Sequence, residues 1–221
     1  MQPVATVVSF GRGPNQAVAG LDATTLASDL VPWSDDLFAR LKRAEGGSLL
    51  FLLADADDDA ALAGATKAAR ILRRRGGGDA IVVLPPVPAL PGPQARSHLE
   101  RASQLTGSCA VRPIGRASWA DAVRCFVEPL AVFGLVGVEP REIRALLRPR
   151  PALLHLWDDD SLDRSLRDAR EVLVSCRLRP TSTLREVDAA AERVRTATAA
   201  PLVLAGPEVD EGPRAIAAVL L

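Results

Sequence analysis

Residues 49–64 read Leu-Leu-Phe-Leu-Leu-Ala-Asp-Ala-Asp-Asp-Asp-Ala-Ala-Leu-Ala-Gly, an apolar run that passes through four acids into an alanine-rich segment. The uninterrupted apolar run is typical of a strand buried on both faces, and it predicts a strand over residues 48–54. The segment behind the acids has a helical pattern, which predicts a helix over residues 59–75. A buried strand that leads through a short turn into a helix is the repeating unit of a parallel α/β sheet.

The same alternation of strand and helix continues on both sides of this stretch. The other predicted strands cover residues 4–10, 80–84, 109–113, 152–157, 171–176, 201–205 and 215–220. The other predicted helices cover residues 34–44, 94–105, 118–134, 141–147, 162–169 and 184–197. We predict a capping box between Thr183 and Glu186 at the last helix, and a surface loop in the proline-rich residues 85–93.

The composition indicates a globular protein without a polyanionic partner. Lys+Arg 27 balances Asp+Glu 27, so the broad attraction of a basic protein to nucleic acid or anionic lipid is missing. We therefore expect no nucleic-acid partner and no direct membrane contact. Cys109, Cys125 and Cys176 lie in separate apolar runs, which predicts core residues of a cytoplasmic protein rather than a disulfide framework or metal site.

The turn after the first strand contains Gly11, Gly13 and Asn15. Backbone N–H groups in a glycine-containing turn from a strand into a helix can face an anion. Pro14 removes one of these donors, so an ordinary tight turn is the competing interpretation. These three residues are candidate nucleotide-binding positions.

The acids Asp55, Asp57, Asp58 and Asp59 allow two interpretations. Carboxylates interact favourably with a helix N-terminus, which favours a capping cluster. Asp55 and Asp57 also match the acid pair of Mg²⁺-dependent phosphatases, in which one carboxylate attacks phosphate and its neighbour is the acid. No later Lys or acidic pair stands where that chemistry needs it.

Two further positions carry candidate polar groups. Glu139 and Glu142 are three residues apart at the start of a predicted helix, so both carboxylates lie on one face, as a partner contact or as a charged helix start. His98 and His155 are far apart and lack ligand spacing, and we expect His155 to be a core residue of a strand.

Taken in chain order, these segments resemble FtsZ, the bacterial relative of tubulin, over almost the whole chain. Gly11, Gly13 and Asn15 look like a remnant of its glycine-rich loop. Gly64 matches the end of its phosphate-binding signature, Gly-Gly-Gly-Thr-Gly-Thr-Gly, but acids and alanines replace the glycines before it. Residues 134–144 are similar to the family segment Gly-Leu-Ile-Asn-Leu-Asp-Phe-Ala-Asp-Val-Lys, which completes the GTPase site of a neighbouring subunit, with Gly137 in place of Asn.

The resemblance implies an FtsZ/tubulin-like α/β fold in two parts. Residues 1–137 would form a mostly parallel, Rossmann-like sheet with helices on both faces and a central helix. Residues 138–221 would form a smaller α+β domain. The family's guanine-reading acid on the central helix is not identified, and the connection from Gly11 to Leu49 is much shorter than the family's equivalent.

These departures predict a pseudo-GTPase rather than an enzyme. Four carboxylates would repel a triphosphate, and side chains in place of glycine block close backbone approach. We predict a subunit without a cofactor that assembles with itself or with another protein, including an authentic FtsZ. The candidate interface residues are Asp55, Asp57, Asp58, Asp59, Glu139 and Glu142. Two alternatives stay open, a residual GTPase that uses GTP and Mg²⁺ in a site completed between subunits, and the Mg²⁺-dependent phosphatase.

Overall fold

The structure is a computed structural model, and it describes residues 5–10, 28–32, 49–55, 58–74, 79–132, 134–209 and 215–221. The predicted helix over residues 34–44 lies outside these ranges. So do Gly11, Gly13, Asn15 and Asp57.

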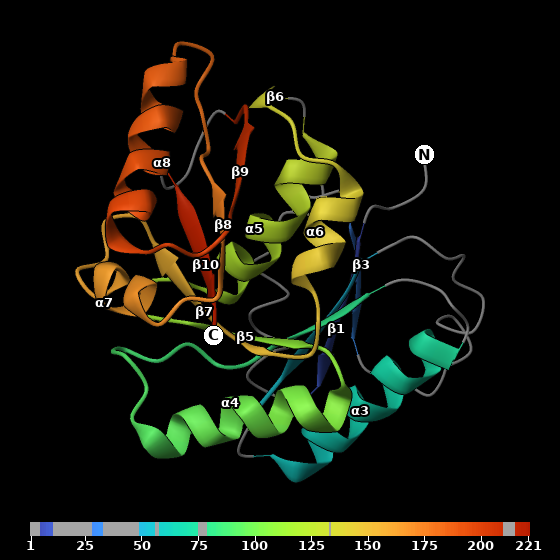
Figure 1. Cartoon of the computed structure of the whole chain (residues 1–221). Helices are drawn as coiled ribbons and strands as arrows, with labels where there is room; N and C mark the ends of the chain where they lie inside the picture. Colours follow the sequence, from blue (N-terminus) through green and yellow to red (C-terminus); the bar gives the residue numbers. More distant parts are fainter. Residues whose placement is uncertain are drawn as a thin grey trace.

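One ten-stranded sheet runs through the molecule in the order β2-β1-β3-β4-β5-β7-β10-β8-β9-β6 (Figure 1). The strands are β1 (Ala5–Phe10), β2 (Ser28–Pro32), β3 (Leu49–Ala54), β4 (Ala80–Val83), β5 (Cys109–Pro113), β6 (Gly134–Val136), β7 (Pro151–Leu156), β8 (Glu171–Ser175), β9 (Leu202–Pro207) and β10 (Ile216–Leu220). Every pairing from β2 to β7 is parallel. Strand β10 is antiparallel to β7 and β8, β8 is parallel to β9, and β6 is antiparallel to β9. The predicted mostly parallel α/β sheet is confirmed.

Helices cover both faces of this sheet (Figure 1). They are α3 (Asp59–Arg74), α4 (Pro93–Thr106), α5 (Trp119–Ala131), α6 (Pro140–Leu146), α7 (Leu162–Arg167) and α8 (Leu184–Ala197). On β3 the side chains alternate between faces, so Leu52 packs with α3 and α4, while Phe51 packs with α5. The rings of Phe51 and Phe126 are 6.4 Å apart between centroids. Helices α7 and α8 share a third core with β8 and β10.

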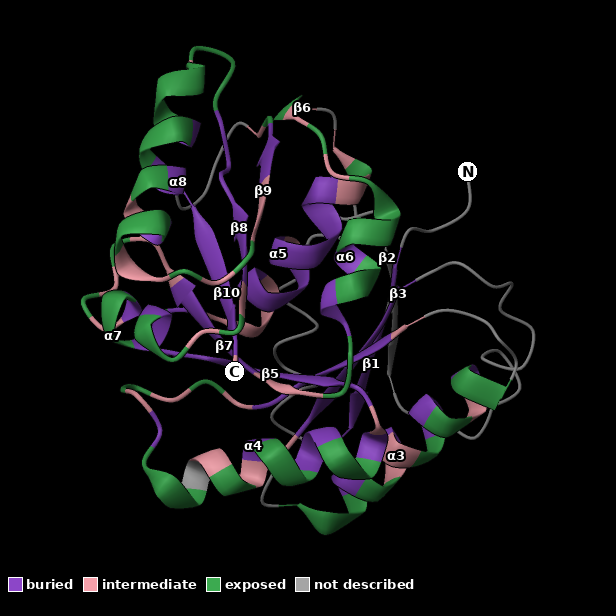
Figure 2. Ribbon diagram, viewed as in Figure 1, coloured by how far each residue is buried: buried purple, intermediate pink, exposed green. Residues whose placement is uncertain are grey.

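The buried residues lie on the strands and on the inner sides of the helices (Figure 2). Both faces of β3 are buried, which is why its sequence is an unbroken apolar run. Cys109, Cys125 and Cys176 are buried and free, which confirms that they are core residues. Burial raises the pKa of the Cys109 and Cys176 thiols to about 12.

Helix α5 is the central helix of the molecule. It contacts β3 and β5 in the parallel half of the sheet, and β8, β9 and β10 in the other half. The predicted division at residue 137 stays a prediction. Strand β5 precedes this residue and β7 follows it, and the two strands are paired in one sheet.

Three details of the sequence prediction are wrong. The helix predicted over residues 118–134 ends at Ala131, two residues after Pro129, and the following residues form β6. Strand β2 was not predicted; it is five residues long and ends in a proline. Thr183 is the N-cap of α8, but its side chain makes no capping hydrogen bond, so the capping box is absent at this helix.

In the part of the chain that the structure describes, no helix is long and apolar enough to cross a membrane.

Candidate functional site

The candidate site is the edge of the sheet where β1, β3, β4, β5 and β7 end. These strands are parallel, so their carboxyl ends lie at one edge. In open α/β sheets, ligands bind in the crevice at this edge. The acids that follow β3 belong to it.

The N-terminus of α3 is capped by one of these acids. The Asp58 carboxylate accepts hydrogen bonds from the N–H groups of Ala60 and Ala61, at 2.9 and 3.1 Å. The N–H of Leu62 bonds the Asp58 carbonyl oxygen at 3.0 Å. Asp59 forms an exposed ion pair with Arg101 at 3.7 Å. The capping interpretation of the acidic run is therefore confirmed for Asp58.

This cap occupies two of the free backbone donors at the start of α3. A helix N-terminus binds an anion through its first free N–H groups. Here Asp58 supplies a negative charge and fills two of those donors itself. The start of α3 is therefore capped by an anion of the chain itself.

Replacing Asp58 with alanine should lower the free energy of unfolding by about 1 kcal/mol, because two N–H groups of α3 lose their acceptor. Urea denaturation measures this loss. Asp160→Ala is a control in a turn outside the helix, and it should change stability by less than about 0.5 kcal/mol. Equal effects of the two variants would contradict the capping role.

Gly64 is explained by packing. A Cβ atom at this position would lie 2.7 Å from Cδ1 of Phe10, so glycine allows α3 to approach β1. The residue that matches the end of the phosphate signature therefore has a structural reason to be glycine without any nucleotide.

The segments that follow β4 and β5 are hydrogen-bonded to each other. After β4 the chain enters two prolines, and Val87 then forms a bridge with Ile114 beyond β5. The Val87 N–H bonds Pro113 O at 3.0 Å, and the Gly115 N–H bonds Val87 O at 2.8 Å. The proline-rich loop is held against the edge of the sheet.

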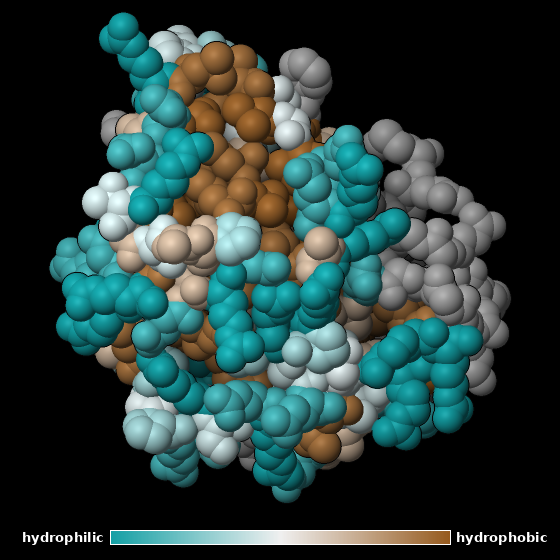
Figure 3. Space-filling view, in the orientation of Figure 1, coloured by the Kyte–Doolittle hydropathy of each residue, from teal (hydrophilic) through white to brown (hydrophobic). Residues whose placement is uncertain are grey.

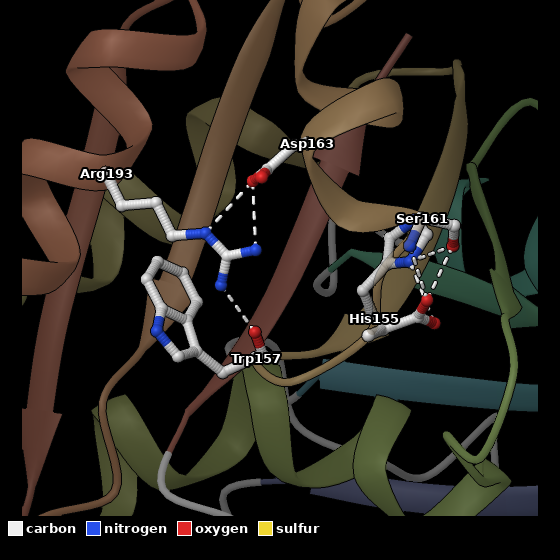
Figure 4. Close-up of polar contacts among 6 residues, drawn as sticks. His155, Trp157, Ser161, Asp163 and Arg193 are labelled. Atoms are coloured by element: carbon white, nitrogen blue, oxygen red, sulfur yellow. Dashed lines mark hydrogen bonds and ion pairs between the residues drawn. The ribbon is translucent and has the colours of Figure 1, made fainter.

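A polar network stands at the exit of β7 (Figure 4). Asp159 Oδ1 accepts hydrogen bonds from the N–H and hydroxyl of Ser161, at 2.8 and 2.7 Å. Asp159 Oδ2 lies 3.3 Å from Nδ1 of His155, and Ser161 Oγ lies 3.4 Å from the same nitrogen. Gly115 has φ +64°, and a Cβ there would be 2.7 Å from Asp159 Oδ2.

This network is not arranged as a catalytic triad. A triad needs the nucleophile on one ring nitrogen and the acid on the other. Here Ser161 and Asp159 both approach Nδ1, and the imidazole is completely buried. Its Nε2 has no hydrogen-bond partner among the residues that the structure describes. The predicted role of His155 as a core strand residue is confirmed.

His155 should make stability depend on pH. Burial lowers its pKa below 6.5, and this outweighs the opposing contribution of Asp159. Below pH 6.5 the unfolded chain therefore binds a proton that the native state does not. The contribution of neutral His155 to the free energy of unfolding is fully present above that pH. As the pH falls, the free energy of unfolding drops by at most about 1.4 kcal/mol per pH unit until the native pKa of His155 is reached.

Urea denaturation between pH 7.5 and pH 5.5 measures this slope. In His155→Gln the slope should be smaller than in the unmodified protein. An unchanged slope in His155→Gln would refute the assignment.

Both acids of the central helix are already engaged. Asp121 forms a capping box with Ser118, and it lies 3.6 Å from Arg124. Glu128 is 1% exposed and bonds Nε of Arg177 at 2.8 Å. Burial raises the pKa of Glu128, and Arg177 opposes this rise. Both carboxylates of α5 are thus engaged within the protein, although Oε1 of Glu128 lacks a hydrogen-bond partner among the described residues.

The carboxylates of Glu139 and Glu142 make local contacts at the start of α6. Glu142 accepts a hydrogen bond from the Glu139 N–H at 2.8 Å, and Glu139 pairs with Arg141. Both residues are exposed. Their charged helix-start role is confirmed, and their contact with a partner stays a prediction.

The structure brings together only part of the predicted site. Asp55, Asp58 and Asp59 follow β3, while Glu139 and Glu142 begin α6 elsewhere in the chain. Among the residues that the structure describes, no three His, Cys, Asp or Glu side chains are grouped to hold a metal ion. The sequence reasoning missed the polar network of β7 and the pair between Glu128 and Arg177. Ser118 and Asp121 are three residues apart, which is the spacing of a capping box, so the cap of α5 could have been predicted from the sequence.

Comparisons with known proteins agree with this geometry. No family model matches the sequence, and no curated protein matches it. Among solved structures, an FtsZ dimer from M. jannaschii has a TM-score of 0.66 at 15% identity, over 98% of this chain and 87% of that chain. TubZ from Bacillus thuringiensis serovar israelensis, in GDP-form protofilaments, has a TM-score of 0.56 at 10% identity, over 99% and 85%.

A third match is CetZ from Methanosaeta thermophila, with a TM-score of 0.56 at 9% identity, over 98% of this chain and 86% of that chain. These likenesses cover 98% to 99% of this chain. The protein has the tubulin/FtsZ-like fold.

Proposed function

We propose that this protein is a pseudo-GTPase of the FtsZ/tubulin-like fold, a protein-interaction subunit that assembles without hydrolysing nucleotide. One observation carries the proposal: the Asp58 carboxylate fills the N–H groups at the start of α3, where a phosphate would have to bind. A bound triphosphate would have to displace this carboxylate and overcome its charge.

Two other features support the loss of nucleotide chemistry. Asp121 and Glu128, the acids of α5, are committed to a helix cap and to a buried ion pair. Gly64 is needed for packing against Phe10. These three residues therefore have structural roles that do not require GTP.

Assembly is the function that the fold retains in this proposal. The similar structures include an FtsZ dimer and TubZ protofilaments, in which those proteins associate with their own kind. We propose that this chain pairs with itself or with an authentic FtsZ, and that Glu139 and Glu142 contribute to the contact.

The proposal is tested by titrating the protein with fluorescent GTP and by measuring phosphate release with Mg²⁺. We expect no saturation below about 1 mM nucleotide, which corresponds to less than about 4 kcal/mol of binding free energy. A purified FtsZ is the positive control. Micromolar binding with turnover would overturn the proposal and favour the residual GTPase, and loss of that turnover in Glu142→Gln would place the residue in its site.

A second arm tests the cause of the lost binding. The variant Asp58→Gly removes the internal anion and restores glycine, while Asp160→Gly removes an acid from an unrelated turn. If the carboxylate blocks phosphate, only Asp58→Gly should bind nucleotide better than the unmodified protein.

A further inference from the structure

An apolar surface is open between α8 and α6, over β9 and β6 (Figure 3). Leu184 on α8 is 60% exposed and Leu135 on β6 is 51% exposed, which makes them two of the three exposed large hydrophobic residues among those described. Leu204 of β9 is partly buried and lines a groove of about 400 Å³ against α8. Exposed apolar surface of this kind marks a binding face.

One stripe of α8 borders the groove. Leu184, Asp188, Ala191 and Arg195 all line it. Their spacing of four, three and four residues places them on one side of the helix. Ala191 lies at the middle of this stripe but is only 2% exposed, so the accessible side chains of the stripe are those of Leu184, Asp188 and Arg195.

The charges of the stripe are opposite and unpaired. Asp188 and Arg195 are both exposed, and neither forms an ion pair or hydrogen bond with any residue that the structure describes. Seven residues separate them, about 10 Å along the helix, which is too far for a direct contact. The stripe therefore carries an anion and a cation on opposite sides of Ala191, three and four residues away.

The helix is firmly held on its other side. Nε of Arg193 lies 2.9 Å from the Asp163 carboxylate of α7, and Nη1 lies 2.5 Å from the carbonyl oxygen of Trp157 (Figure 4). The same guanidinium lies 4.7 Å from the centre of the Trp157 ring. Arg193 thus connects α8 to α7 and to Trp157, the residue that follows β7.

We propose that α8 pairs with α8 of a second copy, in a closed dimer with twofold symmetry. An antiparallel crossing of the exposed sides of the two helices, centred midway between Asp188 and Arg195, places Asp188 of each copy beside Arg195 of the other, which forms two equivalent ion pairs. It also brings Leu184 of each copy to the start of the other β9, where Leu202 is partly exposed. The proposal rests on the assembly function and assigns self-pairing to α8, which leaves Glu139 and Glu142 for contact with another protein. It predicts a contact that closes at two copies rather than one that grows into a filament.

Charge exchange gives the sharpest test. Sedimentation velocity over a range of concentrations should show a monomer–dimer equilibrium without larger species. The single variants Asp188→Arg and Arg195→Asp each create like charges at both pairs, so each should weaken the dimer at least about tenfold. The double variant should dimerise again, and an equimolar mixture of the two single variants should form a heterodimer.

Leu184→Glu should also weaken the dimer, while Leu105→Glu, at a similarly exposed leucine of α4, should not. All substituted side chains are exposed, and circular dichroism checks that each variant is folded. The proposal is overturned by a protein that stays monomeric, by a mass that grows beyond the dimer, or by single variants that fail to dimerise when mixed. GTP turnover with an intact dimer would refute the proposed pseudo-GTPase alone.

Discussion

Replacing Arg177 with methionine should lower the free energy of unfolding by about 3–5 kcal/mol, because it leaves the buried carboxylate of Glu128 without its partner. The two side chains are 4% and 1% exposed, and Nε of Arg177 lies 2.8 Å from Glu128 Oε2. Water cannot replace the lost charge at this depth. The pair joins α5 to the residues that follow β8, so its loss should affect both halves of the sheet.

The pH dependence of this variant has a defined sign. Burial already raises the pKa of Glu128, and Arg177 is the largest influence that lowers it. Without Arg177 the pKa rises further above 4.5. The decrease in the free energy of unfolding is therefore largest above the native pKa of Glu128. It becomes smaller as the pH falls toward 4.5, because the carboxyl group of Glu128 then binds a proton in the native state.

Two comparisons make the result specific. Arg116 and Asp158 form an ion pair in which the side chains are 73% and 68% exposed, so Arg116→Met should cost less than about 1 kcal/mol. The double variant Glu128→Leu/Arg177→Met removes both charges and should recover most of the lost stability. Urea denaturation measures all three. A loss in Arg177→Met no greater than that in Arg116→Met would contradict the buried pair.

The sequence predicted those parts of the fold that depend on local patterns. The run from Leu49 to Ala54 is apolar because both of its faces are covered, and this identified β3 and the parallel sheet. Asp58 was identified as part of a capping cluster because a cap depends only on residues two or three positions away.

The remaining features depend on distant contacts. Glu128 and Arg177 are 49 residues apart, and each looks like a surface charge in its own segment. The strand β6 exists because it pairs with β9, and its short apolar sequence fits the end of a helix equally well. His155 was correctly predicted to be buried, but its contact with Asp159 depends on a turn that has no periodic pattern.

Gly134 offers the second large effect, because it lies where β6 meets β9 (Figure 1). A Cβ atom there would collide with the carbonyl oxygen of Gly206, and it would lie 2.7 Å from Cα of Pro207. Both obstacles are backbone atoms of a paired strand, so they cannot move aside as a flexible side chain would. Gly134→Ala should therefore cost about 1–3 kcal/mol and detach β6 from β9.

Gly137 provides the matched control, three residues further along the same segment. A Cβ atom at Gly137 has no atom within 4 Å, so Gly137→Ala should change stability by less than about 0.5 kcal/mol. Gly137→Asn restores the residue of the FtsZ segment, and it should be tolerated equally well. Urea denaturation measures stability, and hydrogen exchange at the amides of β9 reports whether β6 has detached. If Gly134→Ala behaves like Gly137→Ala, the close pairing of β6 with β9 is wrong, and with it the reason that glycine stands at the start of this segment.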